Sequence, residues 1–361
     1  MADLIAVHLL RRDHHRHIGG DISELELTVE GLQRHGIDAM AATWEDAPER
    51  ADVVNLYNLQ YPVRLAEDYA EARRRWPAAA TVITPIFWTY RLGEVARSRD
   101  MALMNKAARR VVRSRLTWVR CRRLLTGAGA VFVKTSAEAR LLTRFFRTPM
   151  PAIIVPNAVR ADVWHVDHAA ARTRRADFLS AHGLDNDIRT VIASVARLDP
   201  GKNQRVLVRA AASLPDTGLV LVGPATHGRY AERVLAEADR LLPGRFAWLG
   251  PRSPVGVREV LAHADTHALP SYYEVASTVA IEAALAGCEV VMTRTAATDE
   301  LWGDLVHTCA PHSVRSVIRA LVQAQAIPRQ PPLASRAGEF DLDLAGRAAA
   351  DAYRLLVAAR R

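Results

Sequence analysis

The sequence predicts an α/β protein made of two doubly wound parallel-sheet domains. The chain has 361 residues, which is more than one hydrophobic core usually holds. Short apolar runs alternate with segments of helical periodicity in both halves of the chain. A polar stretch at residues 160–187 interrupts this alternation once, and the same pattern then starts again. These three observations favour two domains of one architecture over a single large one.

Six short apolar runs in the first half are expected to form buried strands. They are Leu4–Leu10, Ile37–Ala42, Asp52–Tyr57, Thr81–Ile86, Ala130–Lys134 and Ile153–Pro156. The spacing of leucine and valine predicts a helix over Ile22–His35, and Gly36 is a suitable place for that helix to end. Strands that alternate with helices form a parallel sheet covered on both faces.

The second half repeats this organisation with five expected strands. They are Thr190–Ala196, Gly218–Val222, Phe246–Leu249, Thr266–Leu269 and Glu289–Thr293, with helices expected between them. We therefore divide the chain into an N-terminal domain at 1–165, a linker at 166–187 and a C-terminal domain at 188–335. A last segment, 336–361, carries an Ala-rich helix that is expected to pack back toward the N-terminal domain. Ligands of such sheets bind beyond the carboxyl ends of the strands, so the two domains are expected to face a cleft.

Composition indicates a globular, reduced protein. Half of the residues are apolar, but no run approaches the ~18 apolar residues of a membrane span. Met1–Leu10 is followed directly by arginine residues, so it is interpreted as a first strand and not as a signal peptide. Cys121, Cys288 and Cys309 have no spacing typical of a zinc site or a disulfide framework. We therefore expect a cytoplasmic protein.

The net charge of +9 arises almost entirely in the first half, where residues 1–180 hold 28 basic and 20 acidic residues. The excess is densest over Met101–Arg123, with eight basic residues and no acidic one. Only three of the 48 basic residues are lysines, so arginine-rich codon usage and a solvated helix face are one explanation. Contact with anionic lipid at the inner face of the membrane is a second, because apolar side chains lie among these arginines. Nucleic acid is not an expected partner, since no pattern of a nucleic-acid-binding motif is present.

Two segments carry the residues expected to bind an anionic ligand. In Ala196–Lys202 a strand ends, turns at Pro200-Gly201 and is followed by a helix, so Arg197 and Lys202 can face one anion. In Ser271–Gly287, Glu274 lies in a loop after a strand and Glu282 lies early in a short apolar helix. The first residues of that helix offer backbone N–H groups to a diphosphate. Glu282 can accept hydrogen bonds from paired hydroxyls such as those of ribose.

These segments resemble the signature of the retaining glycosyltransferases of group 1 (family 4), which have the GT-B fold of two Rossmann-like domains. The family reads Pro-Ser, then Glu-x7-Glu, Ala-x-Ala-x-Gly and Val-Val, and this chain reads PSYYEVASTVAIEAALAGCEVVMT. Ala196–Lys202 resembles the family's Arg…Lys diphosphate clamp, and Trp248-Leu249-Gly250 resembles its Phe-Leu-Gly. Ile18-Gly19-Gly20 and Val155–Val159 resemble its Gly-Gly loop and its Pro-Asn-Gly-Val. The five matches occur in the family's order over most of the chain.

The resemblance implies a metal-independent transfer of a sugar from a nucleoside-diphosphate sugar to an acceptor hydroxyl, with retention of configuration. Arg197 and Lys202 would neutralise the leaving diphosphate, and Glu274 would contact the donor sugar. The remaining donor-binding residues implied are Gly19, Gly20, Arg252, Ser277, Thr278, Val279 and Glu282. The acceptor would be a glycan, a lipid-linked compound or a small molecule, as in the synthesis of cell-surface polysaccharides, glycolipids or secondary metabolites. No cofactor other than the sugar nucleotide is expected.

The chain departs from the family pattern beside the sugar. Val275-Ala276-Ser277 stands where the family often has Gly-Phe-Gly, and Ala296-Ala297 stands where it often has Gly-Gly. The family's histidine after the fourth strand has no counterpart in Thr84–Tyr90. Two other functions therefore stay open, a sugar-nucleotide epimerase and a catalytically silent GT-B binding or scaffold subunit.

Acceptor contacts are expected beside the Gly-Gly loop and after the fourth strand. His14, His15 and His17 precede this loop, and Tyr90 follows the fourth strand. The three histidines have no acidic or cysteine partners nearby, so they are not expected to bind a metal. An exposed loop without a function is the alternative for these histidines.

Overall fold

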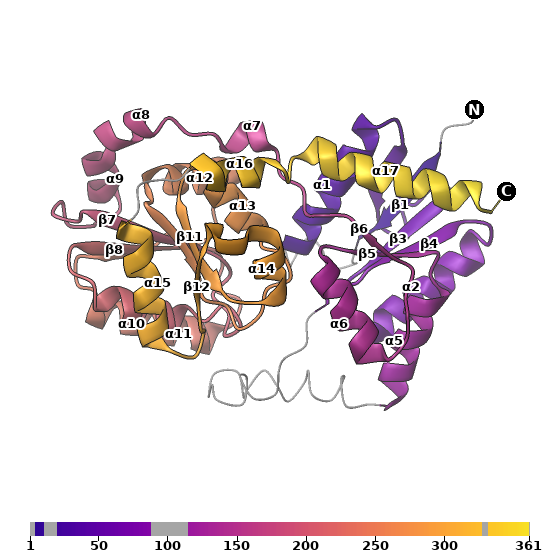
Figure 1. Ribbon diagram of the computed structural model, residues 1–361, viewed down its shortest axis with the longest axis horizontal. Coiled ribbons are helices and arrows are strands. Elements are labelled where there is room, and N and C mark those ends of the chain that lie inside the picture. Colours follow the sequence, from indigo (N-terminus) through magenta and orange to yellow (C-terminus); the bar gives the residue numbers. More distant parts are fainter. Residues whose placement is uncertain (1–3, 11–19, 88–114, 327–330, 361) are drawn as a thin grey trace. The chain divides into compact units, whose positions relative to one another are not determined.

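The computed structural model describes residues 4–10, 20–87, 115–326 and 331–360. The chain divides into two compact units (Figure 1). The first unit contains the described residues up to Arg160 together with those from Phe340 onward. The second unit contains residues 161–339. The first unit is therefore discontinuous, because its last helix follows the whole of the second unit in the chain.

A six-stranded parallel sheet in the order β2-β1-β3-β4-β5-β6 forms the centre of the first unit. The strands are β1 (Ile5–Leu9), β2 (Asp38–Ala42), β3 (Val53–Tyr57), β4 (Ala80–Thr84), β5 (Ala130–Val133) and β6 (Ala152–Ile154). The described helices of this unit are α1 (Gly20–Arg34), α2 (Pro62–Arg75), α5 (Arg115–Gly127), α6 (Ser136–Phe146) and α17 (Leu342–Ala358). Successive strand residues point to opposite faces, so Val53 packs with α1 and α17 whereas Val54 packs with α2, α5 and α6.

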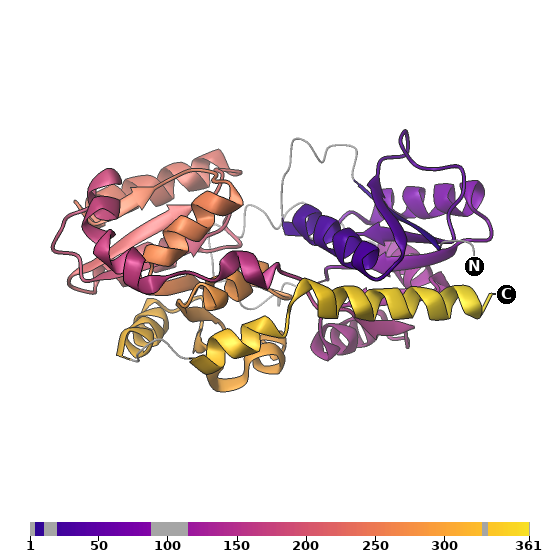
Figure 2. The same ribbon diagram turned by 90° about the horizontal axis from the view of Figure 1, so that it is seen from above.

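Helix α17 lies along α1 in both views of the molecule (Figures 1 and 2). The two helices approach closely where Gly31 faces Gly346. A Cβ atom on Gly346 would lie 2.5 Å from the carbonyl oxygen of Gly31, which is closer than real Cβ contacts allow. Tyr353 of α17 is fully buried and stacks on Phe132 of β5, with ring centroids 5.5 Å apart. The C-terminal helix therefore completes the core on one face of the first sheet.

A second six-stranded parallel sheet, in the order β12-β11-β10-β7-β8-β9, forms the centre of the second unit. The strands are β7 (Thr190–Val195), β8 (Thr217–Val222), β9 (Phe246–Trp248), β10 (Thr266–Leu269), β11 (Glu289–Thr293) and β12 (His307–Cys309). The described helices are α7 (Ala161–Trp164), α8 (His168–Thr173), α9 (Arg175–Ala181), α10 (Gln204–Ala212), α11 (Gly228–Leu241), α12 (Pro254–His263), α13 (Thr278–Leu285), α14 (Ala296–Trp302), α15 (Val314–Ala326) and α16 (Pro331–Gly338), with a 3₁₀ turn at Gly303–Leu305. Strands β8 and β9 lie on one side of β7, and strands β10, β11 and β12 lie on the other side. Such a change of direction at a central strand is typical of doubly wound sheets.

The predicted fold class is confirmed, because each unit is a parallel sheet that alternates with helices. Strand β12 is absent from the sequence-based expectation, since its three residues, His307–Cys309, form no apolar run. Residues 166–187, predicted as a linker, contain α8 and α9. The last helix, which was expected to pack toward the N-terminal domain, lies against α1 of the first unit.

Substituting Gly346 with alanine tests the close approach of α1 and α17. Although alanine favours a helix over glycine by about 1 kcal/mol, its methyl group would overlap the backbone of Gly31. We expect Gly346→Ala to lower the unfolding free energy by about 1–3 kcal/mol, measured by urea denaturation. Gly338→Ala is the control, because nothing lies within 4 Å of the added methyl group there. An unchanged or raised stability of Gly346→Ala would show that the helices separate freely.

Candidate functional site

The carboxyl edge of the second sheet brings together two of the residues singled out from the sequence. The Nζ atom of Lys202, at the start of α10, lies 2.6 Å from the Oε1 atom of Glu274 in the loop after β10. The side chains of Lys202 and Glu274 are 20% and 11% exposed. Because the pair is largely shielded from water, its attraction is stronger than that of an ion pair on the surface. The two loops are thus joined by charge at the edge where ligands of such sheets bind.

Asn203 fixes the position of the loop that carries Lys202. It caps the N-terminus of α10 with a left-handed backbone, at φ 58°. Its buried amide nitrogen donates to the carbonyl oxygen of Pro270, 3.1 Å away, and to that of Pro311, 2.6 Å away. These carbonyls follow β10 and β12, so one side chain connects the loops after three strands. The role of Asn203 was not predicted, because neither partner is near it in the sequence.

The loops after β7 and β10 are also in direct contact at Gly201. The backbone N–H of Tyr272 donates to the carbonyl oxygen of Gly201, 2.8 Å away. A Cβ atom on Gly201 would lie 2.5 Å from the hydroxyl oxygen of Tyr273. The Tyr273 ring therefore covers this glycine, and any larger residue at position 201 would displace the ring. Tyr273 was read in the sequence only as part of the loop, and no local pattern indicated this contact.

Gly223, at the end of β8, permits the backbone to pass close to the loop after β7. It has φ 136°, and a Cβ atom on it would overlap the carbonyl group of Ala196. The indole N–H of Trp248 donates to the Gly223 carbonyl oxygen at 3.0 Å. Arg252, the candidate for base contact, is exposed and packs over Gly256 of α12. The loops after β7, β8 and β9 thus converge on the same edge as Lys202.

The N-terminus of helix α13 lies at the same edge of the second sheet. Ser277 caps the helix, since its hydroxyl accepts from the backbone N–H of Ala280, 3.3 Å away. Thr278 and Val279 form the first turn of the helix. An α-helix carries partial positive charge at this end, which favours an anionic ligand.

Glu282 lies just over one turn into α13. Its carboxylate forms no hydrogen bond or ion pair with any residue that the structure describes, and it is partly buried. Burial raises the pKa of Glu282 from the ordinary value of 4.5 to about 7, because the charged form loses hydration. A carboxyl group in this environment is protonated more readily than one in water.

Arg197 lies in the same loop as Lys202, and His267 lies close enough to Lys202 to be affected by its charge. The Arg197 side chain is exposed, while its carbonyl oxygen accepts from the amide of Gln204 at 2.8 Å. His267 lies fully buried in β10, and burial together with the charge of Lys202 lowers its pKa to about 4. This histidine is therefore neutral near pH 7. Lys202 supplies the fixed positive charge of the loop, and Arg197 adds one from the surface.

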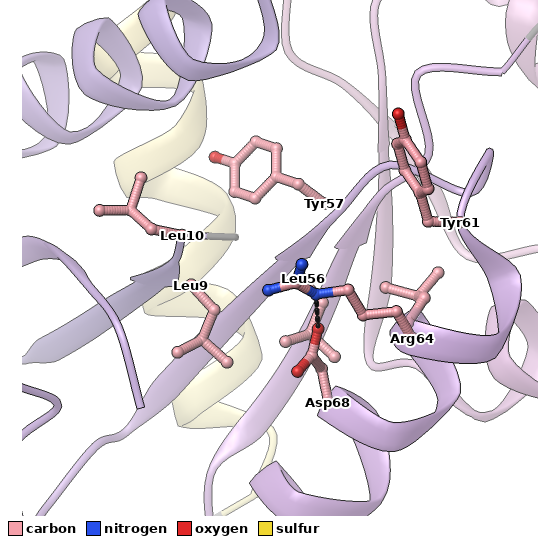
Figure 3. Close-up of a pocket in the computed structure, with 8 residues that line it drawn as sticks. Leu9, Leu10, Leu56, Tyr57, Tyr61, Arg64 and Asp68 are labelled. Atoms are coloured by element: carbon pink, nitrogen blue, oxygen red, sulfur yellow. Dashed lines mark ion pairs between the residues drawn. The ribbon is translucent and has the colours of Figure 1, made fainter. Parts of the chain in front are cut away.

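The first unit has a hollow at the carboxyl edge of its own sheet (Figure 3). Tyr57, Tyr61, Arg64 and Asp68 line it together with leucine side chains from β1, β3 and α2. The hollow is small and opens to solvent. Arg64 and Asp68 form an ion pair along helix α2 at its border, with their charged atoms 3.6 Å apart.

A buried polar network lies behind this hollow. The His8 ring accepts or donates at both nitrogens, with Nδ1 2.6 Å from the Tyr57 hydroxyl and Nε2 2.9 Å from the Tyr353 hydroxyl. Burial lowers the pKa of His8 to about 3, so the ring is neutral and one nitrogen must accept. The Asn55 amide also donates to Tyr353, at 3.1 Å, and Thr84 donates to Asn55. The network fixes the tyrosine that borders the hollow.

Five of the predicted site residues lie outside the described residues. They are His14, His15, His17, Gly19 and Tyr90. Gly20 is the first residue of α1. The described residues contain no cluster of three or more histidine, cysteine or acidic side chains that could hold a metal ion. None of the described helices is both long enough and apolar enough to cross a membrane.

Solved structures of glycosyltransferases share the GT-B fold class of this chain, with two parallel-sheet units flanked by helices. Sucrose-phosphate synthase from Thermosynechococcus elongatus has a TM-score of 0.79 with this chain, at 16% identity over 99% of this chain and 100% of the other. The Anabaena protein HepE in complex with UDP-glucose has a TM-score of 0.72, at 16% identity over 96% of this chain and 98% of the other. These similarities establish the fold.

Residues 178–333 match the family model of the glycosyl transferases group 1, so the resemblance predicted from the motifs is confirmed there. The D-inositol 3-phosphate glycosyltransferase of Mycobacterium sp. (strain KMS) is 37% identical over 169 residues, which are 45% of this chain and 37% of the relative. The protein of the same name from Segniliparus rotundus is 30% identical over 214 residues, which are 56% of this chain and 46% of the relative. The chain thus spans less than half the length of these curated relatives.

The raised pKa of Glu282 makes the stability of the second unit depend on pH. Below about pH 4.5, Glu282 is protonated in both the folded and the unfolded chain. Between about pH 4.5 and about pH 7 the unfolded chain loses this proton while the folded chain keeps it, so the folded state loses stability as pH rises. Glu282→Gln is neutral throughout, so we expect its stability relative to the unsubstituted chain to increase by about 1–3 kcal/mol between pH 5 and pH 8. Urea unfolding at both pH values measures this difference.

The matched control for this prediction is Glu232→Gln, at an exposed position on α11. Its stability difference should stay the same at both pH values. An equal difference for Glu282→Gln at pH 5 and pH 8 would contradict the burial argument.

Proposed function

We propose that the chain is a retaining glycosyltransferase that transfers a sugar from a nucleoside-diphosphate sugar to an acceptor hydroxyl. The observation that carries this proposal is the meeting of Lys202, Glu274 and the start of α13 at one edge of the second sheet, with the partly buried Glu282 in the same helix. The family match lies wholly within this unit, which supports its assignment to the donor. HepE, which shares the fold, binds UDP-glucose.

Lys202, Arg197 and the first turn of α13 would bind the diphosphate. Cleavage of a glycosyl–phosphate bond leaves more negative charge on the leaving group and positive charge on the sugar. Cations and N–H dipoles that are already in place stabilise this separation without reorganisation. Lys202 is held at 2.6 Å from Glu274, so it is oriented before the donor arrives.

Glu282 and Glu274 would bind the two ends of the donor. Two adjacent ribose hydroxyls can donate to the Glu282 carboxylate, which has no partner among the described residues. Glu274, in the loop with Val275-Ala276-Ser277, would contact the sugar. Retention follows when the acceptor oxygen bonds to the anomeric carbon on the face from which the glycosyl–phosphate bond breaks, while the leaving phosphate oxygen takes the proton of the acceptor hydroxyl. Neither a covalent nucleophile nor a metal ion is required for this step.

The acceptor would be a hydroxyl compound such as a glycan, a lipid-linked sugar or a small molecule. Inositol 3-phosphate appears in the name of curated relatives that match about half of this chain, so it is one compound to test. Because the family match ends within the second unit, it supports the choice of donor more strongly than the choice of acceptor.

We further propose peripheral contact with anionic membrane through the basic segment Met101–Arg123, at the inner face of a cytoplasmic membrane. The structure describes this segment from Arg115 onward, where it forms the N-terminal part of helix α5. Arg120, Arg122 and Arg123 are exposed there, and Leu116 is 82% exposed. Exposed arginines beside an exposed apolar side chain suit a surface of anionic lipid headgroups.

Incubation with UDP-, GDP- and dTDP-sugars, with and without acceptors, tests the function. We expect one donor to be turned over and the new bond to keep the anomeric configuration, as read by NMR. Lys202→Ala should lower kcat/KM by at least about 10²-fold, the scale for losing one preorganised contact to developing charge. Arg209→Ala is the control, because this exposed α10 side chain pairs with Glu237 and not with Glu274.

The possible outcomes separate the proposal from its rivals. Binding without turnover of any donor would favour a silent binding subunit, and conversion of the donor sugar without transfer would favour an epimerase. An inverted anomeric product would overturn retention alone.

Sedimentation with phosphatidylglycerol vesicles tests the membrane contact. We expect binding that falls with salt and that weakens when Arg120, Arg122 and Arg123 are changed together to Gln, because each cation near an anionic surface contributes about 1 kcal/mol. The double variant Arg315→Gln/Arg319→Gln, at exposed sites on α15, should bind like the unsubstituted chain. Equal binding to neutral phosphatidylcholine vesicles would contradict the proposal.

A further inference from the structure

The loop Arg197–Lys202 is held from outside by the segment Pro224–His227, which connects β8 to α11. The backbone N–H of Leu198 donates to the Pro224 carbonyl oxygen at 2.9 Å. The Thr226 hydroxyl donates to the Leu198 carbonyl oxygen at 3.4 Å. These bonds place His227 beside the loop, at the position that precedes α11.

Asp199 is the residue of this loop on which its shape depends. Its Oδ1 atom accepts from the backbone N–H of Gly201 at 2.7 Å, and its carbonyl oxygen accepts from the backbone N–H of Lys202 at 2.9 Å. The Asp199 side chain is only 7% exposed. A buried carboxylate needs partners for both oxygens, because an unpaired one is costly. Oδ1 is satisfied within the loop, so Oδ2 needs a partner from elsewhere.

His227 supplies that partner. Its Nε2 atom lies 3.0 Å from the Asp199 Oδ2 atom. Since a carboxylate oxygen only accepts, Nε2 must carry the proton in this contact. The His227 ring is 44% exposed, so it adds little to the core and can be replaced without leaving a cavity. Its main contact with the loop is therefore this hydrogen bond.

We propose that His227 is a positioning residue for the diphosphate contact, acting through Asp199 on Lys202. The effect on ligand binding rests on the proposed function. The contacts of His227 with Asp199 and of Asp199 with Gly201 are present without a ligand. The His227–Asp199 bond fixes the Asp199 carboxylate, the carboxylate fixes the turn at Gly201, and the turn sets the direction of Lys202 toward Glu274. His227 itself does not contact the diphosphate.

Hydrogen exchange in the free protein tests the coupling without any ligand. We expect His227→Ala to speed exchange at the Gly201 and Lys202 amides by about tenfold, the scale for losing one hydrogen bond to a charged group. His227→Gln keeps an N–H donor and should restore most of the protection. His165→Ala is the matched control, because His165 is exposed in the same unit and accepts the Arg258 bond through its carbonyl. Unchanged exchange in His227→Ala overturns the proposal.

Calorimetric titration with UDP, GDP and dTDP tests the consequence for binding. For the diphosphate that binds best, His227→Ala should weaken binding by about tenfold, and His227→Gln by less. In a Lys202→Ala background the same substitution should have almost no further effect, since it acts through Lys202. Additive effects of the two substitutions would overturn the proposal. If none of the three diphosphates binds the unsubstituted chain, the proposed function fails and the exchange measurement alone decides the role of His227.

Discussion

The amide of Asn203 holds together the loops at the carboxyl edge of the second sheet. A parallel sheet brings the ends of its strands to one edge, but it does not decide how the loops beyond that edge are arranged. Asn203 donates to carbonyl oxygens after β10 and after β12 while its own backbone begins α10. One buried side chain thereby fixes three loops relative to each other. The Lys202–Glu274 ion pair is possible because this arrangement leaves the two side chains opposite each other.

The strands of both sheets were predictable because burial on both faces requires continuous apolar residues. Runs such as Gly218–Val222 and Glu289–Thr293 are nearly the strands β8 and β11 as observed. His307–Cys309 lies at an edge of its sheet, next to β11 only, and carries polar residues, so it has no such run. Edge strands are bound on one side alone and leave a weaker signal in the sequence.

Residues of the candidate site were predictable only where they lie in one short sequence segment whose spacing is typical of an anion-binding site. Glu282 and the first turn of α13 belong to one helix, and Lys202 lies between strand β7 and helix α10, so their types and positions indicated an anion site. Asn203, Tyr273 and His227 act through partners that are distant along the chain. No periodicity encodes such contacts. Their roles arise from how the loops meet, which is a property of the folded unit.

The position of α17 has a consequence for how the chain is made. This helix covers one face of the first sheet, and Tyr353 fills its core, yet it is translated after all of residues 161–339. During synthesis, α1 alone of these two helices can cover this face of the first sheet while the second unit already has all its described strands. Domains usually complete their folding in the order of synthesis. Here the first unit is completed only after the second has been synthesised, and until then part of its apolar core stays exposed to water.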